Sequence, residues 1–197
     1  METVQLEIAA VAARLIVDEG LDYGSAKRHA LKQMGLPART ALPGNDELDD
    51  AVREHIAVFC ADTQPVELLA LRRLALQWMV RLARFRPYLS GAVWQGTATR
   101  RSDIRIELYC DDSKSAELAL LDIGADFQAG TATGLGGVAV DVLSVHSFCR
   151  ELNEEVGVHL LIYDRDDIRR ARRVDGKDRL LRADMETVRR LVHDSAP

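Results

Sequence analysis

The alternation of hydrophobic and polar residues changes period near residue 87 of the chain. Before that point, apolar residues recur every three to four positions, which predicts helices over residues 4–20, 24–35, 45–60 and 66–85. Beyond it, apolar and polar residues alternate, which predicts short strands over residues 89–96, 103–110, 137–145 and 156–164. Two further stretches keep the helical period, residues 113–124 and 184–194.

Breakers and capping residues separate the first helices. Gly20 and Gly35 follow the last periodic positions of two helices, and Ser25 is a predicted N-cap of the second. The loop LPARTALPGND holds two prolines and a glycine, which predicts a break before the third helix. Pro65 suits the first turn of the fourth helix, where a missing N–H costs nothing.

This order of elements predicts an α+β fold, in which a helical N-terminal region precedes a mixed sheet with flanking helices. We divide the chain into a helical region over residues 1–63, an α/β core over 64–165, and a basic segment with a C-terminal helix over 166–197. The basic segment interleaves arginines with acids and is nearly free of aromatic residues, so we expect a solvated stretch and no nucleic-acid arm.

Composition narrows the class of protein. The chain has 197 residues, 47% hydrophobic and 29% charged, as in ordinary globular domains. A formal net charge of -5 argues against broad nucleic-acid binding. The N-terminus METVQLEIAA lacks a basic leader, and no apolar run has the length of a membrane span, so we expect a cytoplasmic protein with no membrane contact. Three widely spaced cysteines indicate neither a disulfide framework nor a zinc site.

The stretch GAVWQGTATRRSDIRIELYCDD, residues 91–112, contains a glycine turn, a Ser-Asp pair and an alternating strand. It resembles the signature of the nucleotidyltransferase superfamily, the fold of polymerase-beta-like enzymes, which has Gly-Ser in a turn, Asp-x-Asp on a strand and a third carboxylate on a later strand. Gly91 and Gly96 match the family's glycines, Ser102 and Asp103 match its Ser-Asp, and Asp141 falls where the third carboxylate is expected. The resemblance covers residues 71–145 and implies a nucleotidyltransferase-like sheet.

The chain departs from this signature at the residues that hold magnesium. Arg105 stands where the second aspartate of Asp-x-Asp is expected, and an arginine cannot ligate a cation. Glu107 shares the face of Asp103 and Arg105, but four residues of strand put it about 13 Å from Asp103. If catalysis remains, the resemblance implies Asp103 and Asp141 as metal ligands and Asp103, Asp141 and Glu107 as catalytic residues, with Mg²⁺ as the cofactor. We expect Arg105 to pair with Asp103, Asp141 or both.

The glycine turn is altered too, because Ala92 replaces the serine that offers a hydroxyl to phosphates. Gly91 and Gly96 keep the backbone freedom of such a turn, and hydroxyl groups remain at Thr97 and Ser102. Together with Arg105, these groups could bind a phosphate without a metal ion. We therefore take Gly91, Gly96, Thr97, Ser102 and Arg105 as candidate ligand-binding residues.

Three functions remain open from the sequence. The first is a protein with a nucleotidyltransferase-like fold that lacks two-metal catalysis and binds a nucleotide, another phosphorylated ligand or a protein partner. The second is an active, divergent nucleotidyltransferase that uses Asp103 and Asp141. The third is an assembly protein whose apolar N-terminal helices form a homodimer or bind a partner.

The opening AARLIVDEGLDYGSAKRHALKQMGL also resembles a family of bacterial proteins that are sometimes labelled UDP-N-acetylmuramate–alanine ligases. The sequence does not support that activity, because it has no glycine-rich loop ending in Gly-Lys-Ser/Thr for the phosphates of ATP. The five histidines have no ligand-like spacing, and no Ser-His-Asp motif is visible, so we expect surface or core roles for them.

Overall fold

The computed structural model describes residues 2–110, 112–134, 137–172 and 180–195. The chain divides into two compact units. The first comprises Met1–Val66 and Thr97–Ser102, and the second comprises Glu67–Gly96 and Asp103–Pro197. The short loop 97–102 thus belongs with the N-terminal helices, although it lies within the α/β core in the sequence-based division.

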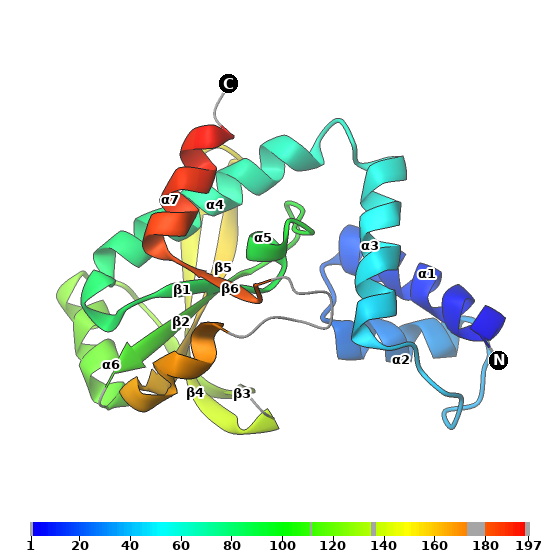
Figure 1. Ribbon diagram of the computed structural model, residues 1–197, viewed down its shortest axis with the longest axis horizontal. Coiled ribbons are helices and arrows are strands. Elements are labelled where there is room, and N and C mark those ends of the chain that lie inside the picture. Colours follow the sequence, from blue (N-terminus) through cyan, green and yellow to red (C-terminus); the bar gives the residue numbers. More distant parts are fainter. Residues whose placement is uncertain (1, 111, 135–136, 173–179, 196–197) are drawn as a thin grey trace. The chain divides into compact units, whose positions relative to one another are not determined.

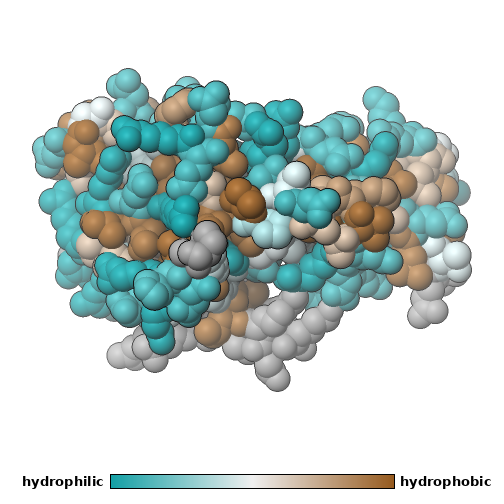
Figure 2. Space-filling model, turned by 90° about the horizontal axis from the view of Figure 1, so that it is seen from above, coloured by the Kyte–Doolittle hydropathy of each residue, from teal (hydrophilic) through white to brown (hydrophobic). Residues whose placement is uncertain are grey.

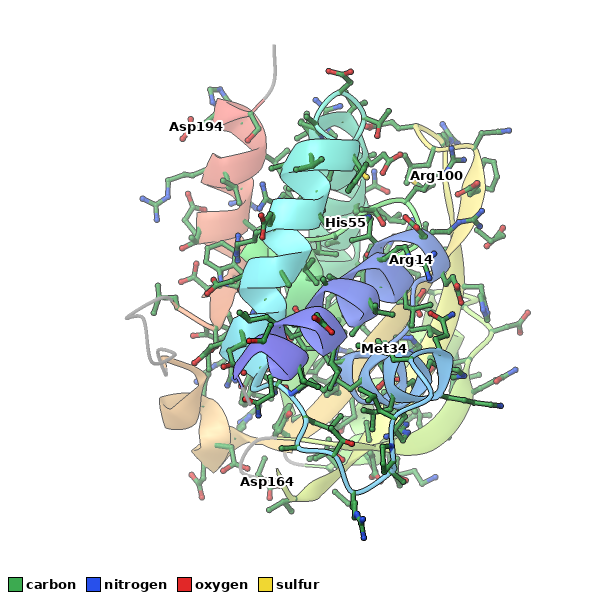
Figure 3. All side chains as sticks on the ribbon, turned by 90° about the vertical axis from the view of Figure 1, so that its right-hand side faces the viewer. Arg14, Met34, His55, Arg100, Asp164 and Asp194 are labelled. Carbon is green, nitrogen blue, oxygen red and sulfur yellow. The ribbon has the colours of Figure 1, made fainter. Side chains whose placement is uncertain are left out.

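The first unit is helical. It contains α1 (Glu2–Glu19), α2 (Tyr23–Gln33) and α3 (Asn45–Phe59), which face the viewer in Figure 3. Their buried side chains form one apolar cluster that includes Ile8, Ala12, Leu15, Leu48 and Val52. Asp22, not Ser25, is the N-cap of α2, because its carboxylate accepts a hydrogen bond from the Ser25 N–H at 3.0 Å. The loop 97–102 is fixed to this unit by buried hydrogen bonds, from Gln64 to the Ala98 carbonyl and from Thr99 to the Val17 carbonyl.

The second unit is a sheet with helices, drawn in Figure 1. Its helical elements are α4 (Gln64–Arg81, which begins in the first unit), η1 (Ala83–Phe85), α5 (Gly91–Gln95), α6 (Ser113–Asp122), η3 (Arg165–Arg172) and α7 (Met185–Asp194). Its strands are β1 (Tyr88–Ser90), β2 (Ile104–Cys110), β3 (Gln128–Thr133), β4 (Ala139–Cys149), β5 (Glu154–Asp164) and β6 (Arg182–Asp184).

The six strands have the order β3-β4-β5-β2-β1-β6, so β3 and β6 are the edges. Strands β2 and β5 are parallel, and the other neighbours are antiparallel, which makes the sheet mixed. Strand β2 lies near the middle of the order and is bordered by β1 and β5. The residues of β2 are therefore held by hydrogen bonds on both sides.

Successive side chains of a strand point to opposite faces, and the two faces of this sheet differ. One face is apolar and is covered by helices, with Ile104, Ile106 and Leu108 of β2 wholly buried. Helices α4 and α7 lie on the same side of the sheet in Figure 1, and the Trp78 indole of α4 donates to Ser147 on this face. The other face holds Asp103, Arg105 and Glu107, and we call it the polar face.

The expected fold class is confirmed, since a helical N-terminal region precedes a mixed sheet with flanking helices. Residues 89–96, expected as a strand, instead form the end of β1 and the short helix α5. Short apolar runs of this length suit either structure, so the pattern could not distinguish them. Strand β3 was not expected, because its sequence QAGTAT has almost no apolar residues. In the basic segment, Arg165–Arg172 is a 3-10 helix, and residues 173–179 lie outside the described part of the chain.

The surface in Figure 2 is mainly hydrophilic, with smaller hydrophobic patches. Within the described ranges, no helix combines the length and the apolar character that crossing a membrane requires.

Candidate functional site on the polar face of the sheet

The glycine turn between β1 and α5 begins the candidate site. Gly91 has φ of 68°, in the left-handed region where a side chain is strained. A Cβ at this position would lie 3.3 Å from Cδ of Arg105, so the bare glycine leaves room for the stem of that arginine. Gly96 ends α5 with φ of 83°, and it closes the turn expected from the sequence.

The registers of all six strands bring one row of polar side chains across the polar face. Residues opposite each other in neighbouring strands share a face. The row runs through Arg182, Ser90, Arg105, His159, Ser144 and Gln128. Arg105 is exposed in the middle of this row.

Asp103 precedes β2 and is held by a histidine of the neighbouring strand. Its Oδ2 lies 3.1 Å from Nε2 of His159, and Nδ1 of His159 lies 2.8 Å from the Ser144 hydroxyl. Gly157 makes this arrangement possible, because a Cβ there would lie 2.5 Å from Oδ1 of Asp103. His146 is opposite Gly157 in the register, so a second imidazole lies close to the carboxylate.

The pKa of Asp103 is lowered from its ordinary value. The main cause is the hydrogen bond from His159, which burial partly opposes, with smaller electrostatic contributions from His159, His146 and the Gly157 N–H. The Asp103 side chain is still 56% exposed. Asp103 is therefore an accessible carboxylate whose ionised form is favoured by a hydrogen bond from the protein itself.

Glu107, two positions beyond Arg105, lies in a different environment. It is only 4% exposed and forms an ion pair with the equally buried Arg182, with Nε and Oε2 separated by 3.4 Å. The Tyr109 hydroxyl donates to Oε2 of Glu107 at 2.8 Å. Burial raises the pKa of Glu107, and Arg182, Tyr109 and Ser90 partly oppose that effect. Burial and the neighbouring carboxylate also raise the pKa of Tyr109, so its hydroxyl remains a donor.

The structure does not bring Asp141 to Asp103. Asp141 is level with Ile162 of β5, and Asp103 is level with Gly157, which separates them by roughly 16 Å along the strand direction. By alternation Asp141 also belongs to the helix-covered face, because Val142 and Ser144 point to the polar face. Asp141 instead lines a cavity at the other end of the sheet, with Asp112 and Asp164, the last of which is labelled in Figure 3.

Two of the expected ligand-binding residues belong to the other unit. Thr97 and Ser102 lie in the loop 97–102, which forms a unit with the N-terminal helices. Ser102 Oγ accepts a hydrogen bond from the Thr99 N–H at 3.1 Å, so it stabilises its own loop. Thr97 is 3% exposed, and among the described residues its hydroxyl has no hydrogen-bond partner.

These residues do not fit the magnesium that the resemblance implies. Magnesium requires several oxygen ligands near 2.1 Å, yet Asp103 is bound by a histidine, and Glu107 by Arg182 and Tyr109. Two-metal sites hold their ions about 4 Å apart, and the register separates Asp103 from Asp141 by far more. In the part of the chain that the structure describes, no group of three or more His, Cys, Asp or Glu side chains could hold a metal ion.

His159, Ser144 and Arg182 were not predicted from the sequence as residues of the site. Arg105 was expected to pair with Asp103, Asp141 or both, whereas the contact seen for Asp103 is with His159. One signal was present in VGVHLLIYD, where Gly157 and His159 interrupt an apolar strand at alternate positions. Such an interruption marks one face of the strand as polar, but it does not reveal which residue lies opposite.

No protein-family model matches the chain, and no curated protein matches it. Among solved structures, the chain is similar to a crystal structure of the Cid1 poly(U) polymerase with bound MgGTP. The two share 16% sequence identity over 50% of this chain, with a TM-score of 0.35. The matched part spans 33% of the polymerase chain, about one third of its length. A likeness of this size carries no information on function.

Proposed function

We propose that this protein binds a nucleotide or another phosphorylated small molecule on the polar face of its sheet, without two-metal catalysis. The observation that carries the proposal is the pair of neighbouring positions Asp103 and Arg105. Asp103 is bound to His159, and the next side chain on the same face is an exposed arginine. Arg105 therefore gives this site a permanent positive charge.

The chemistry of these groups suits a phosphate. A guanidinium group offers several N–H donors in a plane that matches phosphate oxygens, and charge-assisted hydrogen bonds are stronger than neutral ones. His159 and His146 add imidazoles close to Asp103. Gly91 leaves room for the stem of Arg105 and so helps to place its guanidinium at the turn.

Calorimetric titration of the full chain with ATP tests this proposal. We expect affinity to change less than about twofold between excess EDTA and excess magnesium, and Arg105→Ala to weaken binding by about tenfold, or 1.4 kcal/mol. Lys114→Ala, which removes an exposed cation on α6, is the matched control and should bind as the native chain does. Binding that requires magnesium, or pyrophosphate release that Asp103→Ala abolishes, would contradict the proposal and support a divergent nucleotidyltransferase.

A second candidate function, self-association through the helical unit, is favoured by one observation. Val58 and Phe59 at the end of α3 are 65% and 72% exposed, which is high for large apolar side chains. Light scattering of the full chain should then give a dimer mass that Phe59→Ser reduces to that of a single chain. A native chain with the mass of one copy at high concentration would rule out this candidate.

A further inference from the structure

A groove in the second unit lies away from the residues of the proposed function. It is a cavity of about 540 Å³ between helix α4 and the end of strand β4. Arg73, Gln77 and Arg81 line it from α4, and Arg150 and Glu151 line it from the turn after β4. We call it the α4–β4 groove.

The α4 side of the groove is one stripe of polar side chains. Arg73, Gln77 and Arg81 are four residues apart in succession, so they lie one above another on the same side of the helix. A second hollow of about 570 Å³ shares these three residues and Glu151, and it adds the apolar side chains Leu76 and Val80. The groove therefore has a cationic part and an adjoining apolar part.

The cationic part is held in place by buried contacts. Trp78, which is 3% exposed, donates from Nε1 to the Ser147 hydroxyl at 3.0 Å. The guanidinium of Arg81 lies over this indole ring, 5.2 Å from its centroid. A guanidinium held over an aromatic ring keeps N–H donors that can bind an anion.

The opposite wall is fixed by the turn between β4 and β5. Cys149 pairs with Glu154, so Arg150 and Glu151 belong to a four-residue hairpin loop. The loop ends at Asn153, which has φ of 54°, a conformation that asparagine tolerates well. Arg73 NH1 lies 3.1 Å from Glu151 Oε2, which ties this loop to α4.

We propose that the α4–β4 groove binds a small phosphate ester with an apolar body. Three guanidinium groups face one carboxylate there, so the groove has an excess of positive charge although the chain as a whole carries -5. Arg81 and Arg150 bind the phosphate, and Leu76 and Val80 contact the body of the ester. The volume is within the range of roughly 300–1,000 Å³ that small-molecule sites occupy.

The two tryptophans of the chain provide a spectroscopic test with an internal control. The Trp78 indole ring lies beneath Arg81 and its N–H donates to Ser147, whereas the Trp94 indole N–H of α5 donates to the Leu180 carbonyl at 2.6 Å. In ¹H–¹⁵N spectra, titration with phenyl phosphate should shift the Trp78 indole peak saturably and leave the Trp94 peak in place. Trp94→Phe assigns the two peaks.

Variants then separate the two parts of the groove. Arg150→Ala should weaken phenyl phosphate binding at least about tenfold, whereas Arg189→Ala, which removes an arginine of α7, should leave it unchanged. Val80→Ser should weaken the binding of phenyl phosphate about threefold and leave the weaker binding of inorganic phosphate unaltered.

Three outcomes would overturn the proposal: a stationary Trp78 peak, native affinity in the Arg150→Ala variant, or equal affinity for inorganic and phenyl phosphate. Arg105→Ala should have no effect on this titration, so the outcome is independent of the polar face.

Discussion

Asp103 and Glu107 are two acids of one strand face, four residues apart, with opposite behaviour. Contact with His159 lowers the pKa of Asp103, whereas burial raises the pKa of Glu107. Asp103 remains more than half exposed, but Glu107 is enclosed by Arg182 and Tyr109. Sequence spacing alone treats the two residues as equivalent.

This difference in solvent exposure shows that the two carboxylates have separate roles. A buried acid paired with a buried arginine holds strands β2 and β6 in place on either side of β1, and at 4% exposure it is hardly accessible to a ligand. An exposed acid that is hydrogen-bonded to an imidazole can still respond to a ligand or to pH. The candidate site is therefore confined to the Asp103 end of β2.

The largest effect is expected from Glu107→Ala. This change leaves the Arg182 guanidinium buried without its carboxylate, and we expect the free energy of unfolding to fall by about 3–5 kcal/mol. Urea denaturation followed by circular dichroism measures this, with Glu186→Ala on the exposed surface of α7 as control, expected below about 1 kcal/mol. An equal loss of unfolding free energy in the two variants would mean that Glu107 is as solvated as Glu186.

A smaller effect, with a defined pH dependence, is expected from Asp103→Asn. Because the folded-state pKa of Asp103 is lowered, the stability that its ionised form contributes is present above the ordinary value near 3.9. That stability is lost as pH falls through the lowered pKa. The native chain should exceed Asp103→Asn by less than about 1 kcal/mol at neutral pH, since the pair is partly exposed, and the two should converge in acid.

Gly157→Ala is the matched variant for this prediction, because it leaves both partners of the pair unchanged. Its new Cβ would collide with the Asp103 carboxylate and displace it from His159. In the Gly157→Ala background, adding Asp103→Asn should therefore change the free energy of unfolding by the same small amount at neutral and at acid pH. A pH profile identical to that of the native chain would show that the pair with His159 does not stabilise the fold.

The smallest effect on stability is expected from Arg105→Ala. Arg105 is exposed, and Asp103 already has a partner in His159. The free energy of unfolding should therefore change by no more than about 0.5 kcal/mol, with a correspondingly small change in melting temperature. Thermal unfolding measures it, with Lys114→Ala as control. A loss of several kcal/mol would mean that Arg105, like Arg182, has a structural role.

The strand that carries both acids was predictable from sequence, because the alternation in DIRIELYC is a local pattern. The same alternation correctly placed Asp103, Arg105 and Glu107 on one face of the strand. The partner strands were not predictable, since a register is fixed by contacts between distant residues, and a shift of one position reverses every face. That is why Asp141 was assigned to the site and His159, 56 residues beyond Asp103, was not.

The glycine turn illustrates the same limit at shorter range. Gly91 and Gly96 were correctly expected to have unusual backbone freedom, and both have positive φ. The short helix between them was not expected, because five residues carry too little periodicity to reveal it. The membership of residues 97–102 in the helical unit depends on hydrogen bonds to Val17 and Gln64, which no local pattern encodes.

The edges of the sheet have a consequence for the behaviour of the protein at high concentration. An edge strand exposes unpaired N–H and C=O groups, which a strand of another molecule can extend into a larger sheet. Here one edge, β6, is only 3 residues long, and the other, β3, has the sequence QAGTAT, which offers little apolar surface to an added strand. Such edges are poor templates for aggregation. Replacing Gly130 and Thr131 of β3 by valines would create the template that the native sequence avoids.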